Sequence, residues 1–244
     1  VERPASVVKE LVENSFDAAS SSVEVEFARG GTALIRVADD GCGMDRDDAL
    51  MALERHATSK LRSEEDLFRV MTFGFRGEAV PSIASVSRCR LATRMRDAAA
   101  GTEVQVEGGR IVRVRDAGRP GGTEIEVRSL FYNVPARRKF LRRESTEGAH
   151  ILQTLLILGL ARPAVGLTAI RDGHLLFRAA PTDQLAVRIR DLLGPAFLER
   201  LQPIPLIESD GLEIRGFVSR PGQGRSDRSQ QFFFLNGRAV QNGI

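Results

Sequence analysis

The segment from Pro4 to Ala19 carries three polar side chains whose spacing suits chemistry on one face of a helix. At about 100° per residue, Glu10, Asn14 and Asp17 fall within about 60° of one another. A glutamate in such a stripe can accept a proton, and an asparagine amide oxygen can bind a hard cation. Glu13 lies beside the stripe and is an alternative base. A solvated face of an amphipathic helix has the same pattern, so both interpretations stay open.

A second candidate binding motif, Asp39-x-Gly41-x-Gly43, follows the alternating apolar residues of the predicted strand at 33–38. The Asp39 carboxylate can accept a hydrogen bond from an exocyclic amine, and the glycines permit positive φ and close approach of a ligand to the backbone. Further along, Gly122 and Thr123 enter another strand after a glycine-rich turn. Ordinary turns have the same composition, so neither motif is specific by itself.

A glycine-rich loop precedes a short helix in the stretch Gly74-Phe75-Arg76-Gly77-Glu78-Ala79. Backbone N–H groups at such a helix start can bind phosphate. The chain contains no Gly-x-x-x-x-Gly-Lys-Ser/Thr, so this is not a P-loop. A surface loop without a ligand remains the alternative.

Five cations lie within seven residues, namely Arg137, Arg138, Lys139, Arg142 and Arg143. On one helix they would cover much of one side and would suit binding to the DNA backbone. Each phosphate that a cation neutralises steepens the fall of log affinity with log salt concentration by about 0.9. Arg238 is a further candidate. A solvated face, or pairing of the cluster with Glu144 and Glu147, is the alternative.

Composition excludes several classes of protein. Of the 244 residues 42% are hydrophobic and 27% charged, which suits one large domain and part of a second. The net charge of +3 does not by itself indicate nucleic acid. No apolar run approaches the roughly 20 residues of a membrane span, and the first residues do not resemble a signal peptide. We therefore expect a cytoplasmic protein without membrane contact, in which Cys42 and Cys89 are reduced thiols.

The elements that must position these residues follow from periodicity. Antiparallel strands with helices grouped between them predict an α+β fold, a two-layer sandwich of a mixed, mainly antiparallel sheet with helices on one face. The predicted helices cover 4–19, 47–56, 79–86 and one or two segments of 135–160. The predicted strands are 23–27, 33–38, 88–94, 102–107, 110–116, 122–127, 165–171 and 174–179. A long loop is expected at 57–78.

Composition changes near 181–186, which predicts a domain boundary. We assign residues 1–183 to the first domain and 184–244 to part of a second, smaller α/β domain. A helix is expected at 184–193, followed by strands at 203–207, 211–219 and 230–236. The last of these contains Phe232-Phe233-Phe234, which we expect to be a buried strand.

Together and in this order, the motifs resemble the ATPase superfamily of DNA gyrase B, the heat-shock chaperone of about 90 kilodaltons, the histidine kinases and MutL. Longer strings resemble the MutL family of DNA mismatch-repair proteins in particular. They are ERPASVVKELVEN from Glu2, RHATSK from Arg55, GFRGEA from Gly74 and FYNVPARRKFL from Phe131. The second domain would then resemble the ribosomal protein S5 second-domain-like fold.

This resemblance implies a role for each matching residue. Glu10, and not Glu13, would polarise the water that attacks ATP, and Asn14 would bind Mg²⁺. Asp39 would read the adenine amino group. The other residues implied in the nucleotide site are Gly41, Gly43, Met44, Thr58, Lys60, Phe75, Arg76, Gly77, Glu78, Ala79 and Thr123, with Lys60 and the amides of 76–79 closing over the phosphates.

The resemblance also implies partners. They are DNA, bound through its backbone without sequence specificity, a mismatch-recognition protein, downstream repair enzymes, and a second copy of the full-length protein in a bacterial, nucleoid-associated setting. The family's segment before Val1 and its γ-phosphate-contacting lysine are expected outside residues 1–244. The fragment is therefore expected to be mostly monomeric and weakly active. Two alternatives are a type II topoisomerase ATPase fragment and a nucleotide-binding scaffold without turnover.

Overall fold

The computed structural model describes residues 1–54, 79–209, 211–224 and 230–240. Its first part contains the following elements: α1 (Pro4–Asp17), β1 (Ser22–Ala28), the 3-10 turn η1 (Arg29–Gly31), β2 (Leu34–Asp39), α2 (Arg46–Met51), α3 (Ala79–Ala84), β3 (Arg88–Arg94), β4 (Gly101–Glu107), β5 (Arg110–Ala117), β6 (Gly122–Arg128), α4 (Pro135–Lys139), α5 (Glu144–Ala161), β7 (Gly166–Arg171) and β8 (His174–Ala179). The predicted strands of this part are all confirmed, with bounds that differ by a residue or two.

The later part contains α6 (Leu185–Leu193), α7 (Pro195–Glu199), β9 (Leu201–Ser209), β10 (Leu212–Ser219), β11 (Phe233–Leu235) and β12 (Arg238–Val240). β9 pairs with β10, and β11 pairs with β12, both antiparallel. Phe233 and Phe234 are 52% and 37% exposed, so the expectation of a buried aromatic strand is wrong for them. α7 and β12 were not predicted from the sequence, and both are short.

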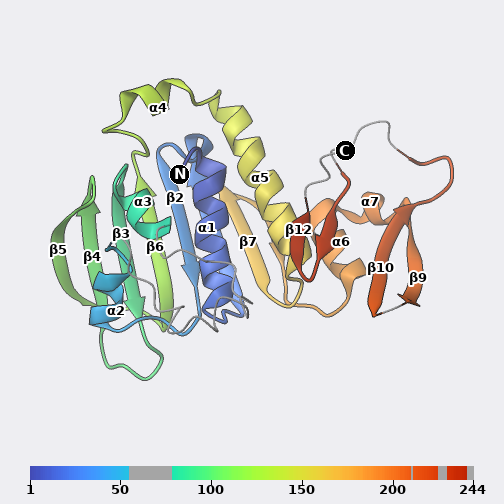
Figure 1. Ribbon diagram of the computed structural model, residues 1–244, viewed down its shortest axis with the longest axis horizontal. Helices are drawn as coiled ribbons and strands as arrows, with labels where there is room; N and C mark the ends of the chain where they lie inside the picture. The colour runs from blue at the N-terminus through green and yellow to red at the C-terminus, as the bar shows by residue number, and fades with distance from the viewer. Residues whose placement is uncertain (55–78, 210, 225–229, 241–244) are drawn as a thin grey trace.

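One mixed sheet organises the first part, in the order β5-β4-β3-β6-β2-β1-β7-β8. All neighbouring pairs are antiparallel except β1 and β7, which are parallel. The helices α1, α3 and α5 lie against one side of this sheet (Figure 1). This confirms the predicted α+β class and mainly antiparallel sheet.

The two faces of the sheet differ because the strands alternate apolar and charged residues. In β1, Val23, Val25 and Phe27 are fully buried under the helices, whereas Glu24 and Glu26 point to the open face. On that open face Arg36 of β2 forms ion pairs with Glu24, Glu26 and Glu124. Charged cross-strand pairs therefore occupy the face that water reaches, and the apolar face forms the core with α1 and α5.

The helix α1 begins at Pro4, which suits a first helical position because its fixed φ is already helical. Its residues Val7, Val8, Leu11 and Val12 are at most 1% exposed and belong to the main core. The turn between β7 and β8 has Asp172 and Gly173 at positive φ, as the predicted hairpin requires.

The helix α6 connects the two parts by packing against α5 and β8. Leu160, Ala179, Ile189 and Leu192 form a second, smaller buried cluster there. Arg188 of α6 is fully buried, and its Nη2 donates to the carbonyl oxygens of residues 163, 165 and 180. The structure therefore shows tight packing beside residues 181–186, while the boundary itself stays a prediction.

Candidate nucleotide site

Three segments far apart in the sequence meet at the carboxylate of Asp39, at the end of β2. Ser15 in α1 donates its hydroxyl to Asp39 Oδ2 at 2.8 Å. The backbone amides of Gly41 and Thr123 donate to Asp39 Oδ1 at 3.0 and 3.2 Å. The tertiary structure thus brings the polar helix, the first glycine motif and the start of β6 to one carboxylate.

The environment of Asp39 affects its pKa in two directions. Burial of the carboxyl raises its pKa above the ordinary 3.8, and the hydrogen bonds from Ser15, Gly41 and Thr123 oppose this, as does the positive charge of Arg119. An ionised carboxylate has about four lone-pair sites, and three donors occupy three of them. Asp39 therefore retains capacity to accept one more hydrogen bond, such as one from an exocyclic amine.

The side chain of Thr93, in β3, contacts both the segment after the glycine motif and the start of β6. Thr93 Oγ1 accepts from the Met44 amide at 2.9 Å and lies 3.2 Å from the Gly122 carbonyl oxygen. It also lies 3.1 Å from the hydroxyl oxygen of Thr123. Met44, Gly122 and Thr123 are thus held by one fully buried threonine.

The two glycines of the motif are required by contacts within the protein. A Cβ at Gly41 would lie 2.8 Å from the Ala18 Cβ, and a Cβ at Gly43 would lie 2.1 Å from the Arg94 carbonyl oxygen. Gly43 also has φ of +70°, which favours glycine. The Cys42 amide donates to the Ala18 carbonyl at 3.0 Å, so the motif is fixed against the end of α1.

The polar stripe of α1 lies beside this junction, since Asn14 directly precedes Ser15. Glu10, Asn14 and Asp17 are half-buried, whereas Glu13 is 6% exposed and pairs with Lys9 at 2.7 Å. Burial raises the pKa of Glu13 in spite of this partner. Within the described part of the chain, the side chains of Glu10 and Asn14 make no hydrogen bond, so Glu10 is the more accessible carboxylate.

Several predicted site residues fall outside the described ranges. They are Thr58, Lys60, Phe75, Arg76, Gly77 and Glu78. Ala79, the last residue of that motif, lies in α3, which the structure describes from Ala79 to Ala84.

The basic cluster is arranged differently from the single helix that its spacing suggested. Arg137, Arg138 and Lys139 belong to α4, which ends at Lys139, and Arg142 and Arg143 lie between α4 and α5. All five are exposed. Among residues with described placement they form no ion pair, although pairing with Glu144 and Glu147 was an alternative. Glu147 instead accepts from the Arg142 backbone amide at 3.0 Å. Arg238, in β12, is also exposed.

Over the four described ranges, no group of three or more His, Cys, Asp or Glu residues is placed to hold a metal ion. In the same ranges no helix has the length and apolarity to cross a bilayer.

Sequence reasoning missed three residues that the structure brings to this site: Ser15, Thr93 and Arg119. Two of them had a detectable signal. Ser15 is a polar residue on the buried face of α1, and Thr93 continues the inward alternation of Cys89 and Leu91 along β3. A polar side chain at a core position needs a hydrogen-bond partner, which marks it for attention. Arg119 lies in a loop and had no such signal.

Comparisons with known proteins bear on the family and the fold of the chain. The family model described as histidine kinase-, DNA gyrase B-, and HSP90-like ATPase matches residues 2–108, and the model of the DNA mismatch repair protein C-terminal domain matches residues 189–244. DNA mismatch repair protein MutL of Opitutus terrae is 52% identical over 99% of this chain, and that of Geobacter sulfurreducens is 50% identical over all of it. The chain spans only 38% and 40% of the lengths of these two relatives.

A solved structure is also similar over the whole chain. It is the Aquifex aeolicus MutL ATPase domain complexed with ADP, which is 35% identical with a TM-score of 0.76. The match covers 100% of this chain and 85% of that structure. Sequence and fold comparisons therefore indicate the same family.

Proposed function

This chain belongs to the MutL family of DNA mismatch-repair proteins, and we propose that its first part binds ATP with Mg²⁺ and hydrolyses the nucleotide to ADP and phosphate. The observation that carries the proposal is the Asp39 carboxylate, which three donors orient and which keeps one acceptor position. The similar Aquifex aeolicus structure is complexed with ADP, which supports nucleotide binding by this chain.

Each residue of the site would contribute a separate function. Asp39 would accept a hydrogen bond from the adenine amino group, and Thr123 and Met44 would line the same end. The Asn14 amide oxygen suits Mg²⁺, which takes few protein ligands in nucleotide sites and completes its shell with phosphates and water. When bound, the metal would neutralise phosphate charge. Glu10 would accept the proton of the attacking water.

The phosphate end of the site remains a proposal from the sequence. Lys60 and the backbone amides of residues 76–79 would bind the phosphates, and Thr58 and Phe75 would lie near them. Among these, the structure describes only Ala79, which lies in α3. Closure of such a segment would exclude water from the site.

The test compares Glu10→Gln with the unsubstituted chain in nucleotide binding and in phosphate release. The glutamine keeps the size of the side chain and cannot accept the proton. Turnover should fall by about 10²- to 10⁴-fold with little change in ATP affinity. Glu107→Gln, an exposed carboxylate of β4, is the matched control and should leave both quantities unchanged.

The results also separate the alternatives. Turnover by Glu10→Gln close to that of the unsubstituted chain would exclude Glu10 as the base. Nucleotide binding without turnover, even in a chain extended to the length of the relatives, would favour the scaffold alternative. The topoisomerase alternative is not favoured, since the relatives and the family model at residues 189–244 are both mismatch-repair proteins.

At the level of the whole protein, we propose that ATP favours a closed, dimeric state and that hydrolysis releases it. This cycle would control contact with DNA, a mismatch-recognition protein and downstream repair enzymes near the nucleoid. Residues 1–244 alone should be mostly monomeric and weakly active. Hydrolysis that needs a closed site would depend on the further residues that the longer relatives contain. Comparing turnover and mass by light scattering between this chain and a longer one tests this point.

A further inference from the structure

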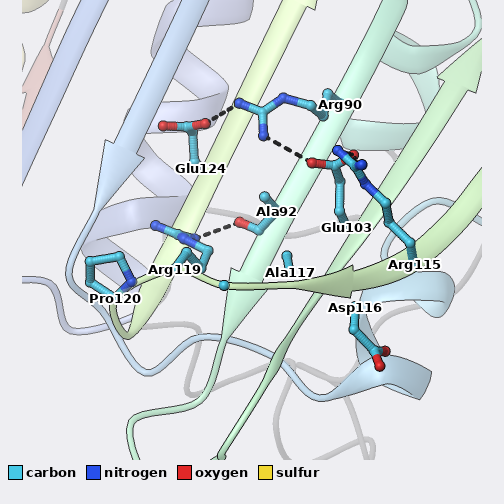
Figure 2. Close-up of a pocket in the computed structure, with 10 residues that line it drawn as sticks. Arg90, Ala92, Glu103, Arg115, Asp116, Ala117, Arg119, Pro120 and Glu124 are labelled. Carbon is cyan, nitrogen blue, oxygen red and sulfur yellow. Dashed lines mark hydrogen bonds and ion pairs between the residues drawn. The ribbon is translucent and has the colours of Figure 1, made fainter.

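Arg119, between β5 and β6, is a half-buried arginine whose guanidinium binds two strand ends at once. Its Nη1 donates to the carbonyl oxygen of Ala92 in β3 and to that of Gly122 in β6, the latter at 2.7 Å. Figure 2 shows the Arg119 side chain directed along the sheet toward Ala92. The same residue lines a hollow of about 590 Å³ on the open face, together with Arg90, Glu103, Arg115 and Glu124.

The Gly122 carbonyl connects Arg119 to the nucleotide site. It also lies 3.2 Å from the hydroxyl oxygen of Thr93, which holds the Met44 amide and the Thr123 hydroxyl. The next amide along β6, that of Thr123, donates to Asp39. Arg119 is therefore linked to the Asp39 carboxylate through the short backbone segment of residues 122 and 123.

That segment has little freedom to move without affecting Asp39. Gly122 has φ of +114°, and a Cβ there would lie 2.1 Å from the Asp39 carbonyl oxygen. A shift of β6 by a few tenths of an ångström would change both this contact and the 3.2 Å bond from Thr123 to Asp39. The guanidinium holds the segment from the open face, opposite the side on which Ser15 contacts Asp39.

The positive charge of Arg119 also affects the protonation of Asp39. Its positive charge opposes the effect of burial on the pKa of Asp39, and burial in turn lowers the pKa of Arg119. The guanidinium therefore favours an ionised Asp39, which accepts hydrogen bonds and does not donate them.

We propose that Arg119 is a positioning residue that holds residues 122 and 123 so that Asp39 presents its remaining acceptor position to an exocyclic amine. This would make Arg119 a determinant of base specificity. Adenine has an amino group at the position where guanine has a carbonyl oxygen, so a fixed acceptor selects adenine nucleotides. The inference rests on the proposed nucleotide site and assigns a residue that does not itself contact the nucleotide.

The experiment measures dissociation constants for ADP and GDP, and kcat and KM for ATP, in Arg119→Met, Arg119→Lys and the unsubstituted chain. Methionine keeps most of the apolar stem and removes the donors. The ADP dissociation constant and KM should rise about tenfold in Arg119→Met, the effect of about one hydrogen bond, with kcat little changed. The preference for ADP over GDP should fall. Arg119→Lys should restore part of the ADP affinity and part of the preference for ADP, because lysine can donate to one of the Ala92 and Gly122 carbonyls.

Arg115→Met is the matched control, since Arg115 lines the same hollow and pairs with Glu103. It should leave affinity and base preference unchanged. A folded Arg119→Met protein with unchanged ADP affinity and unchanged preference would overturn the inference. An equal rise in the dissociation constants for ADP and GDP, with a lower Tm, would also overturn the inference. It would show that Arg119 only stabilises the fold and does not affect base preference. If the unsubstituted chain binds neither nucleotide, the proposed function itself fails.

Discussion

Asp39 is the residue at which burial and hydrogen bonding act against each other. Burial raises the pKa above 3.8, so the carboxylate is protonated at a higher pH than an ordinary aspartate. A protonated Asp39 loses an acceptor position that the adenine amino group would use. ADP affinity should therefore fall as pH decreases through the folded-state pKa, at a pH above 3.8.

Stability should respond to Asp39 with the opposite sign. A pKa raised by folding means that the protonated carboxyl favours the folded state. This contribution is fully present below the unfolded pKa and is lost as pH rises through the folded one. Asp39→Asn, compared with the unsubstituted chain across pH by isothermal titration and urea unfolding, should remove both dependences. Identical pH profiles of the two proteins would contradict this account.

The two cysteines differ in reactivity because only one is accessible. Burial raises the pKa of Cys89 to about 12, whereas Cys42 is exposed in the glycine motif. Iodoacetamide at pH 8 should modify one thiol in the folded protein and two after denaturation, as counted by mass spectrometry. Cys42→Ser should show no modification while folded. Alkylation of Cys89 in the native state would indicate that β3 opens readily.

At the scale of elements, α4 and the segment that follows it present to solvent cations that form no ion pair with any residue the structure describes. Arg137→Ala with Arg138→Ala should weaken DNA binding and lower the slope of log affinity against log salt by up to about 2, from about 0.9 per phosphate contact. The charge-matched control is Arg110→Ala with Arg113→Ala, two exposed arginines of β5. Equal effects of the two pairs, measured by fluorescence anisotropy, would show that net charge alone matters.

Elements whose partners are close in the sequence could be predicted, and more distant pairings could not. The β1–β2 and β7–β8 hairpins follow from alternation and from the Asp172-Gly173 turn. The parallel pairing of β1 with β7 joins residues more than 140 positions apart and depends on packing that no local pattern reports. The burial of Phe233 and Phe234 was wrongly predicted for a similar reason. Composition shows that these side chains are apolar but not whether another element covers them, and both are exposed.

At the scale of the whole molecule, α6 joins the larger unit to the later strands, and Arg188 secures it. Arg188→Ala would remove three hydrogen bonds from a buried cation to the backbone carbonyls of residues 163, 165 and 180, of which the Pro163 carbonyl would keep the Thr182 amide as a donor. The free energy of unfolding in urea should fall by about 3 kcal/mol. Arg190→Ala, an exposed arginine of the same helix that pairs with Asp191, is the control and should change it by less than about 1 kcal/mol.

The candidate site residues Glu10, Asn14, Asp39 and Thr123 could be predicted from the sequence, and so could the helix and strands that carry them, because local periodicity and turn chemistry act over a few residues. The placement of Ser15 and Thr93 around Asp39, and of Arg119 behind β6, could not. Those contacts form only after strands distant in the chain pair into one sheet, because hydrogen bonds depend on positions in space and not on separation along the chain. Folding therefore converts recognisable motifs into a carboxylate with oriented donors and one remaining acceptor position.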